Sequence, residues 1–139
     1  IRNHLILLFI LIFSNCSSEK FPWDNYTVEE AIDLSENKLI MIDFYANWWA
    51  TCNRLDTDTF SNDDVIAFCT ENFINLKINT DTEYGYKIYK KFSITSLPTI
   101  LFLDSYGNKR DMIIGYHKPK NYLDKIREIQ DTFNPLYNQ

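Results

Sequence analysis

Cys52 and the position three residues before it form the part of the chain whose residue types and spacing bear most directly on chemistry. The stretch DFYANWWATC (43–52) leads from an apolar strand through a short turn into a helix. A cysteine at position 49 would lie at the helix N-terminus, where unpaired N–H groups and the helix dipole stabilise a thiolate. A second thiol at position 52 would allow exchange between a dithiol and a disulfide. Position 49 holds Trp49, which has no ionisable group, so Cys52 has no sulfur partner in this turn.

The other two cysteines are not expected to replace the missing sulfur. Cys69 lies on the apolar face of a predicted helix, where a cysteine most often acts as a small buried hydrophobe. Cys16 follows LILLFILIF (5–13), an apolar run that would reach about 14 Å as a helix, half of a bilayer core. We therefore predict a signal peptide over 1–15, with Cys16 as the lipidated residue of a bacterial lipoprotein. An ordinary secretory signal with an incidental Cys16 is the alternative.

The remaining polar residues indicate no metal site, no cofactor site and no nucleic-acid interface. The two histidines, His4 and His117, are too few for a histidine-based metal cluster. Four aspartates lie close together without the spacing and the glycine of a calcium loop: Asp56, Asp58, Asp63 and Asp64. The net charge is −5 and the basic residues are scattered, so the chain lacks the basic stripe that binds phosphates.

The apolar periodicity predicts one α/β domain. A polar tether over 16–22 precedes the domain at 23–131, and 132–139 form a tail. Aromatic residues and Ile88 are expected on one side of the helix over 83–92. A βαβ unit followed by a hairpin gives a central sheet of about four strands flanked by helices. The expected strands are 39–46, 73–79, 99–104 and 111–116, and the expected helices begin near Thr27, Trp48, Ser61, Glu83 and Pro119.

Two separated motifs resemble those of one family. DFYANWWATC (43–52) and SLPTILFLD (96–104), in this order and on these elements, resemble the thioredoxin fold. Over about residues 23–130 the chain resembles the soluble C-terminal domain of bacterial transmembrane thiol–disulfide interchange proteins and related thioredoxin-like lipoproteins. The departure from that pattern is Trp49, which stands where the family has its first active-site cysteine.

The resemblance implies roles for particular residues. Asp43 matches the buried acid that assists proton transfer to the second cysteine, and Cys52 matches that second, resolving cysteine. Trp48 matches the tryptophan before the first cysteine. Pro98, after Leu97, matches the cis-proline that faces the redox turn. In the family, the backbone before this proline pairs with an extended segment of the partner.

Each of these residues also has a second interpretation. Cys52 either forms mixed disulfides or is a shielded, inert thiol, because burial near a carboxylate raises the pKa of a thiol. Asp43 can persist because its removal would leave a hole in the core. Pro98 can serve as a plain turn before a strand. Trp49 is either an exposed aromatic anchor for a partner or a plug over the empty cysteine position.

The sequence therefore predicts an envelope-located thioredoxin-like protein without a dithiol cycle, which binds extended polypeptides through the Leu97–Pro98 edge and Trp49. The alternative is an oxidoreductase that uses Cys52 as a monothiol. Full activity is a third hypothesis if position 49 is naturally Cys, since the two codons differ by one base. The expected partners are proteins or peptides, with or without thiols. The lipid on Cys16 would hold the chain at the membrane facing the periplasm, and the absence of Asp after Cys16 favours the outer membrane.

Overall fold

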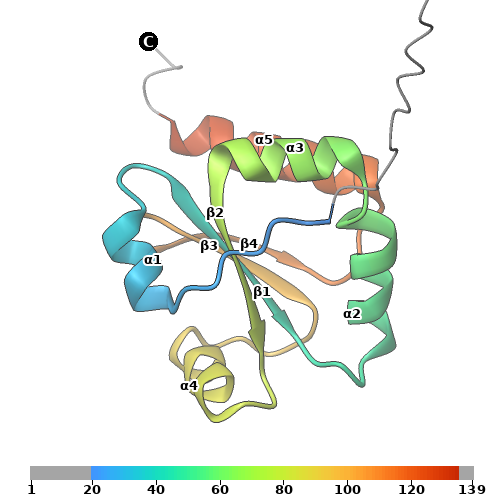
Figure 1. Ribbon diagram of the computed structural model, residues 1–139, viewed down its shortest axis with the longest axis horizontal. Helices are drawn as coiled ribbons and strands as arrows, with labels where there is room; N and C mark the ends of the chain where they lie inside the picture. The colour runs from blue at the N-terminus through green and yellow to red at the C-terminus, as the bar shows by residue number, and fades with distance from the viewer. Residues whose placement is uncertain (1–19, 135–139) are drawn as a thin grey trace, which may run out of the picture.

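The computed structural model describes residues 20–134 (Figure 1). The predicted signal peptide, Cys16 and most of the predicted tail lie outside the described residues. Within 20–134, no helix is long and apolar enough to cross a membrane. The elements are, in chain order, α1 (Val28–Leu34), β1 (Leu39–Tyr45), α2 (Ala50–Arg54), the π-helical segment η1 (Leu55–Thr59), α3 (Asp63–Asn72), β2 (Phe73–Asn79), α4 (Glu83–Lys91), β3 (Thr99–Leu103), β4 (Lys109–Ile114) and α5 (Pro119–Phe133).

The four strands form one mixed sheet in the order β2-β1-β3-β4. β1 pairs in parallel with β2 and antiparallel with β3, and β3 continues antiparallel to β4. The two central strands are almost completely buried, as the unbroken apolar run over 39–46 predicts for a strand covered on both faces. The predicted α/β class with four strands and flanking helices is confirmed.

Helices cover both faces of the sheet, and alternate residues of β1 divide between them. Met41 belongs to the cluster that also contains residues of η1, α3 and α5, whereas Ile42 and Phe44 belong to the cluster with α1 and α4. Figure 1 shows α3 and α5 lying together on one side of the sheet, with α1 and α4 away from them and α2 at one end. Residues 41 and 43 therefore face the side of the sheet on which α2 and η1 lie.

Local capping explains where two of the helices begin. Thr27 and Glu30 form both hydrogen bonds of a capping box at the start of α1, as predicted. The expected cap of α3 at Ser61 is wrong by one residue. Asn62 is the cap, and its Oδ1 accepts hydrogen bonds from the N–H groups of Asp64 and Val65. The Ser61 hydroxyl instead donates to the Thr57 carbonyl in the preceding π-helical segment.

The terminal hairpin forms as predicted but earlier in the chain. β4 spans Lys109–Ile114 in place of the expected 111–116. Asp104 Oδ1 accepts hydrogen bonds from the N–H groups of Tyr106 and Asn108, and Gly107 takes a φ of +80° that suits glycine. This tight turn lets β4 begin soon after Asn108.

Side chains just outside the expected domain limits of 23–131 also belong to the packed fold. Phe21, placed in the predicted tether, is buried against Trp23 and Phe60, with ring centroids 4.1 and 4.8 Å away. α5 continues to Phe133, whose ring packs against the core. The segment before α1 lies against β2, where the N–H of Asp24 donates to the Asn75 carbonyl at 2.7 Å.

α4 packs closely on the end of β2, with Tyr89 against the core and Tyr86 turned outward. Gly85 and Ile88 are buried, and a Cβ at Gly85 would lie 1.8 Å from the Asn79 carbonyl oxygen, so only glycine permits this approach. Tyr86 is exposed to 57%. The expectation that the aromatic residues share a side with Ile88 is therefore wrong for Tyr86, because the inward face is set by the close contact at Gly85.

Candidate functional site

The turn after β1 brings an aromatic residue to the start of α2 and a buried thiol into its first turn. Trp49 is the N-cap of α2, and its side chain makes no capping hydrogen bond. The backbone N–H of Cys52 donates to the Trp49 carbonyl at 3.0 Å. Cys52 is exposed to only 2%, whereas Trp49 is exposed to 44%. The start of α2 thus presents an accessible indole, and the sulfur in its first turn is enclosed.

Burial also changes the acidity of the Cys52 thiol. Desolvation raises the pKa of Cys52, the Ala46 backbone opposes that rise, and the charge of Asp43 adds to it. Cys69 is also free and buried, with its Sγ 4.0 Å from the Met41 Sδ, and desolvation raises its pKa as well. Neither of these described cysteines has a sulfur partner in a disulfide.

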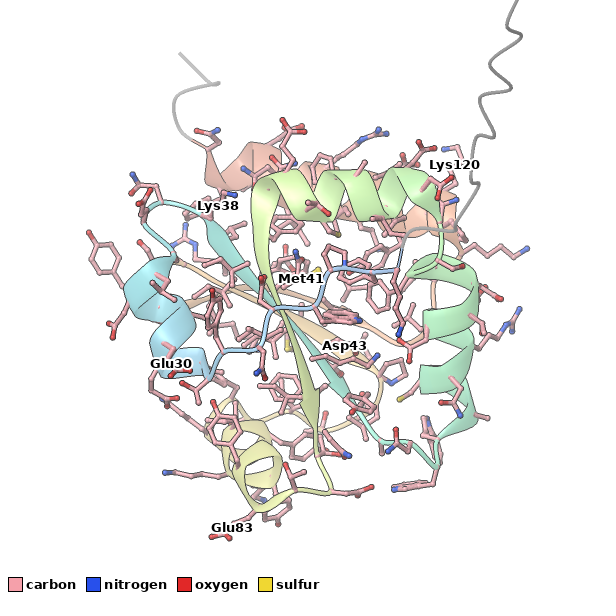
Figure 2. All side chains as sticks on the ribbon, viewed as in Figure 1. Glu30, Lys38, Met41, Asp43, Glu83 and Lys120 are labelled. Carbon is pink, nitrogen blue, oxygen red and sulfur yellow. The ribbon has the colours of Figure 1, made fainter. Side chains whose placement is uncertain are left out.

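Asp43 is held beside Lys77 by the pairing of their strands. The two residues are register partners in the parallel β1–β2 ladder, and Lys77 Nζ lies 3.2 Å from Asp43 Oδ2. Lys77 also donates to Asp56 Oδ1 on η1. Desolvation raises the pKa of Asp43 to about 6, because the nearby Lys77 only partly compensates. Figure 2 shows Asp43 in the interior, whereas Glu30, Glu83 and Lys120 lie at the periphery.

The ammonium group of Lys77 is enclosed by rings as well as by carboxylates. Its Nζ lies 4.6 Å from the ring centroid of Tyr45 and 4.9 Å from that of Trp23. Desolvation lowers the pKa of Lys77, but the charges of Asp43 and Asp56 outweigh it and the net shift is upward. Lys77 therefore stays charged, while Asp43 can take up or release a proton near neutral pH. Asp43 Oδ1, which is buried, accepts no hydrogen bond from the part of the chain that the structure describes.

A groove of about 490 Å³ runs from the start of α2 to α4 and the loop before β3. The rings of Trp48 and Trp49 meet edge to face, with centroids 5.4 Å apart. The Trp48 Nε1–H donates to Asp81 Oδ2 at 2.8 Å. The residues that line the groove are Trp48, Trp49, Thr80, Asp81, Tyr86, Tyr89, Thr95, Ser96 and Leu97.

The loop before β3 presents backbone groups to this groove. The Leu97–Pro98 peptide bond is cis, and the Pro98 carbonyl accepts a hydrogen bond from the N–H of Gly115 at 2.9 Å. The Ser96 carbonyl accepts the hydroxyl of Thr99. Among residues 20–134, no group donates to the Leu97 carbonyl and none accepts from the Leu97 N–H. These two groups are therefore free to pair with an extended chain.

The structure gathers the sequence-predicted residues into two neighbouring places. Asp43 and Cys52 lie in the interior, whereas Trp48, Trp49 and Leu97 line the groove. The sequence reasoning missed Lys77 and its link to Asp56, although a lysine within the apolar strand FINLKIN was a signal that it needed a partner. It also missed three groove residues, Asp81 in the turn before α4 and Tyr86 and Tyr89 on α4. Cys16 lies outside the described residues.

No group of three or more His, Cys, Asp or Glu side chains in the described part of the chain is arranged to hold a metal ion. Asp63 and Asp64 occupy the first turn of α3, where their charges favour the helix dipole. Asp56 binds Lys77 and Asp58 binds Arg54 and the Tyr116 hydroxyl. The clustered aspartates thus have structural partners.

The fold and the turn define a class of protein. A sheet in the order β2-β1-β3-β4, with a turn into a helix after β1 and a cis-proline just before β3, is the thioredoxin fold. The family model for a thioredoxin-like domain matches residues 29–130. The chain therefore belongs to the thioredoxin-like domain family.

Comparison with curated proteins identifies thiol:disulfide interchange proteins as relatives. DsbD of Yersinia pestis (strain Pestoides F) is 33% identical over 96 residues, which cover 67% of this chain and 16% of that protein. DsbD of Actinobacillus pleuropneumoniae serotype 5b (strain L20) is 24% identical over 105 residues, covering 73% of this chain and 18% of the relative. The chain thus spans less than a fifth of the length of these curated relatives.

Solved structures show the same fold at low sequence identity. The DsbH oxidoreductase matches with a TM-score of 0.71 and 13% identity, over 82% of this chain and 87% of that chain. The C-terminal domain of Neisseria meningitidis DsbD in its oxidised form matches with a TM-score of 0.61 and 21% identity, over 76% and 96%. At these identities the likeness concerns the fold, and the function has to be argued from the site.

Replacement of Asp43 by Asn is expected to stabilise the protein above about pH 6. Between the ordinary pKa of 3.8 and about 6, the folded carboxyl keeps a proton that the unfolded chain has lost, so stability falls as pH rises through this window. The Asp43→Asn variant lacks this penalty and should gain about 1 to 3 kcal/mol at neutral pH. Urea unfolding from about pH 4 to pH 8 measures the difference.

The gain should disappear toward pH 4. There the Asp43 carboxyl of the folded wild type is protonated and therefore neutral, as the asparagine amide of the variant is at every pH. Asp33→Asn, an exposed change on α1, is the matched control and should show no such trend. A variant with Asp43→Asn that is less stable than the wild type at pH 7 would contradict the assignment of a desolvated carboxyl.

Cys52 is expected to resist alkylation in the native protein. N-ethylmaleimide should label it about a hundredfold more slowly than an exposed thiol, because the sulfur is enclosed and its pKa is raised. Peptide mass spectrometry reports Cys52 separately from the other cysteines. A Tyr106→Cys variant, at a position exposed to 85%, provides the exposed reference. Labelling of native Cys52 at the rate of that reference would contradict the structure.

Proposed function

We propose that this chain is a thioredoxin-like protein of the bacterial cell envelope that binds extended polypeptides and does not turn over disulfides. The single observation that carries the proposal is the arrangement at the start of α2, where an exposed indole is the N-cap and the cysteine in the first turn, Cys52, is buried. A dithiol cycle requires two thiols within bridging distance. An exposed aromatic pair requires none and is typical of binding hot spots.

The groove supports polypeptide binding in two ways. Exposed rings of Trp48 and Trp49 supply large contact areas at low cost in side-chain entropy. The free backbone groups of Leu97 supply hydrogen bonds to an extended chain, as in other cases of strand addition. Side-chain anchors and a backbone edge lie along the same groove, so one extended segment can use both.

Placement in the envelope follows from the same proposal. The segment 1–15 would direct export, and a lipid on Cys16 would tether the domain through the short segment before Phe21. The alternative of an ordinary secretory signal leaves the domain in the same compartment. Partners would be unfolded or extended segments of envelope proteins.

Binding of an unfolded polypeptide without thiols tests the proposal. Fluorescence anisotropy with reduced, carbamidomethylated ribonuclease A, whose thiols are blocked by a neutral group, should show saturable binding to the purified chain. Trp49→Ala should weaken the binding about tenfold or more, because it removes an exposed anchor of the groove. Tyr106→Ala removes an exposed ring on the β3–β4 turn and is the matched control, which should bind as the wild type does. Absence of binding, or equal binding by both variants, would defeat the proposal.

Restoring a thiol at position 49 tests whether the rest of the turn keeps a redox geometry. Oxidised Trp49→Cys is expected to form one intramolecular disulfide with Cys52 and to gain measurable disulfide reductase activity, because the two positions retain the N-cap and first-turn relation. A double variant that adds Cys52→Ser should lose both. Turnover by the wild-type chain that vanishes in Cys52→Ser alone would instead favour the monothiol oxidoreductase.

A further inference from the structure

The groove combines four aromatic side chains with one carboxylate. Trp48, Trp49, Tyr86 and Tyr89 supply the rings, and Asp81 is the one charged residue among the nine described residues that line it. The remaining lining is formed by hydroxyl side chains and Leu97. No lining residue carries a positive charge, and the whole chain has a net charge of −5. This composition attracts cations and repels carboxylates.

The rings are open to a ligand. Trp48 is exposed to 66%, Tyr86 to 57% and Trp49 to 44%, although all three belong to a groove in a well-packed domain. On α4, the rings of Tyr86 and Tyr89 lie nearly parallel, with an interplanar angle of 17° and centroids 6.5 Å apart. Aromatic rings from α4 and from the turn before α2 are therefore accessible in the same groove.

The indole of Trp48 helps to position Asp81. Its Oδ2 accepts the Trp48 Nε1–H at 2.8 Å, and its backbone N–H donates to Asn79 Oδ1 at 2.9 Å. Among the described residues no donor pairs with Asp81 Oδ1. A hydrogen bond from the indole to a carboxylate polarises the ring toward greater electron density, which strengthens its attraction for a cation. One oxygen thus anchors the tryptophan while the other remains for a ligand.

We infer that this groove selects extended polypeptide segments that carry an arginine or lysine side chain, which lies against the rings with its charge at Asp81. The inference rests on the proposed function and adds the chemistry of the preferred partner. The planar guanidinium of arginine can stack on an aromatic face while donating to a carboxylate oxygen, so arginine is preferred over lysine. Backbone pairing at Leu97 would hold the segment, and the cationic side chain would give it specificity.

Short peptides of one background sequence provide the test. Fluorescein-labelled peptides of alternating valine, serine and threonine carry arginine, lysine, citrulline or glutamate at the centre, and anisotropy gives each Kd with the purified chain. Citrulline has nearly the shape of arginine without its charge. The arginine peptide is expected to bind about tenfold more tightly than the citrulline peptide, and the difference should shrink at high salt. The glutamate peptide should bind most weakly.

Asp81→Asn is expected to reduce the preference for arginine over citrulline from about tenfold to about threefold or less, because it removes the charge that attracts the guanidinium. Asp33→Asn makes the same change of charge on α1, outside the groove, and should leave the preference intact. This comparison separates a local counter-ion from the general effect of net charge.

Four outcomes would overturn the inference. Equal binding of the arginine and citrulline peptides, or a preference that survives Asp81→Asn, would remove the cation specificity and leave polypeptide binding intact. Tight binding of a neutral oligosaccharide such as cellohexaose, without binding of any peptide, would assign the rings to sugar stacking. Failure of all four peptides together with the carbamidomethylated polypeptide would remove both this inference and the proposed function.

Discussion

The parallel pairing of β1 with β2 is the interaction on which the interior of the site depends. It sets Asp43 opposite Lys77, so a carboxyl that is shielded from water has a cation 3.2 Å away. β3 pairs with the other edge of β1 and prevents the strand from shifting. A slip of one residue would turn Asp43 toward α1 and α4 and away from Cys52. The register of one ladder thus fixes the electrostatics around the buried thiol.

The interior of the site brings a carboxyl, an ammonium group and a thiol together. The carboxyl of Asp43 is buried with a pKa of about 6, Lys77 pairs with it, and the thiol of Cys52 is enclosed. Trp49 gives the start of α2 an exposed aromatic surface. Trp48, Trp49 and Leu97 line one groove, so the proposed binding function depends on aromatic area and backbone groups and on no reactive sulfur.

Local signals in the sequence were reliable where the neighbouring residues alone decide the structure. The capping box of Thr27 and Glu30 forms as expected because both partners lie within one helical turn. The cap at Ser61 was predicted wrongly because the preceding π-helical segment presents the Thr57 carbonyl to its hydroxyl. Tyr86 was assigned to the wrong side of α4, since the contact of Gly85 with the Asn79 backbone sets the rotation of that helix.

The order of apolar runs, turns and caps was enough to predict the α/β class, because that class follows from periodicity. The thioredoxin fold was predicted from the resemblance of two motifs, DFYANWWATC (43–52) and SLPTILFLD (96–104). Contacts between residues far apart in the sequence could be identified only in the tertiary structure. Lys77 stands 34 residues from Asp43 and Asp81 stands 33 residues from Trp48, and each meets its partner only through strand pairing and the packing of α4. A linear pattern carries no register between separate strands, so the charge at Asp43 and the groove at Trp48 could be read only from the tertiary structure.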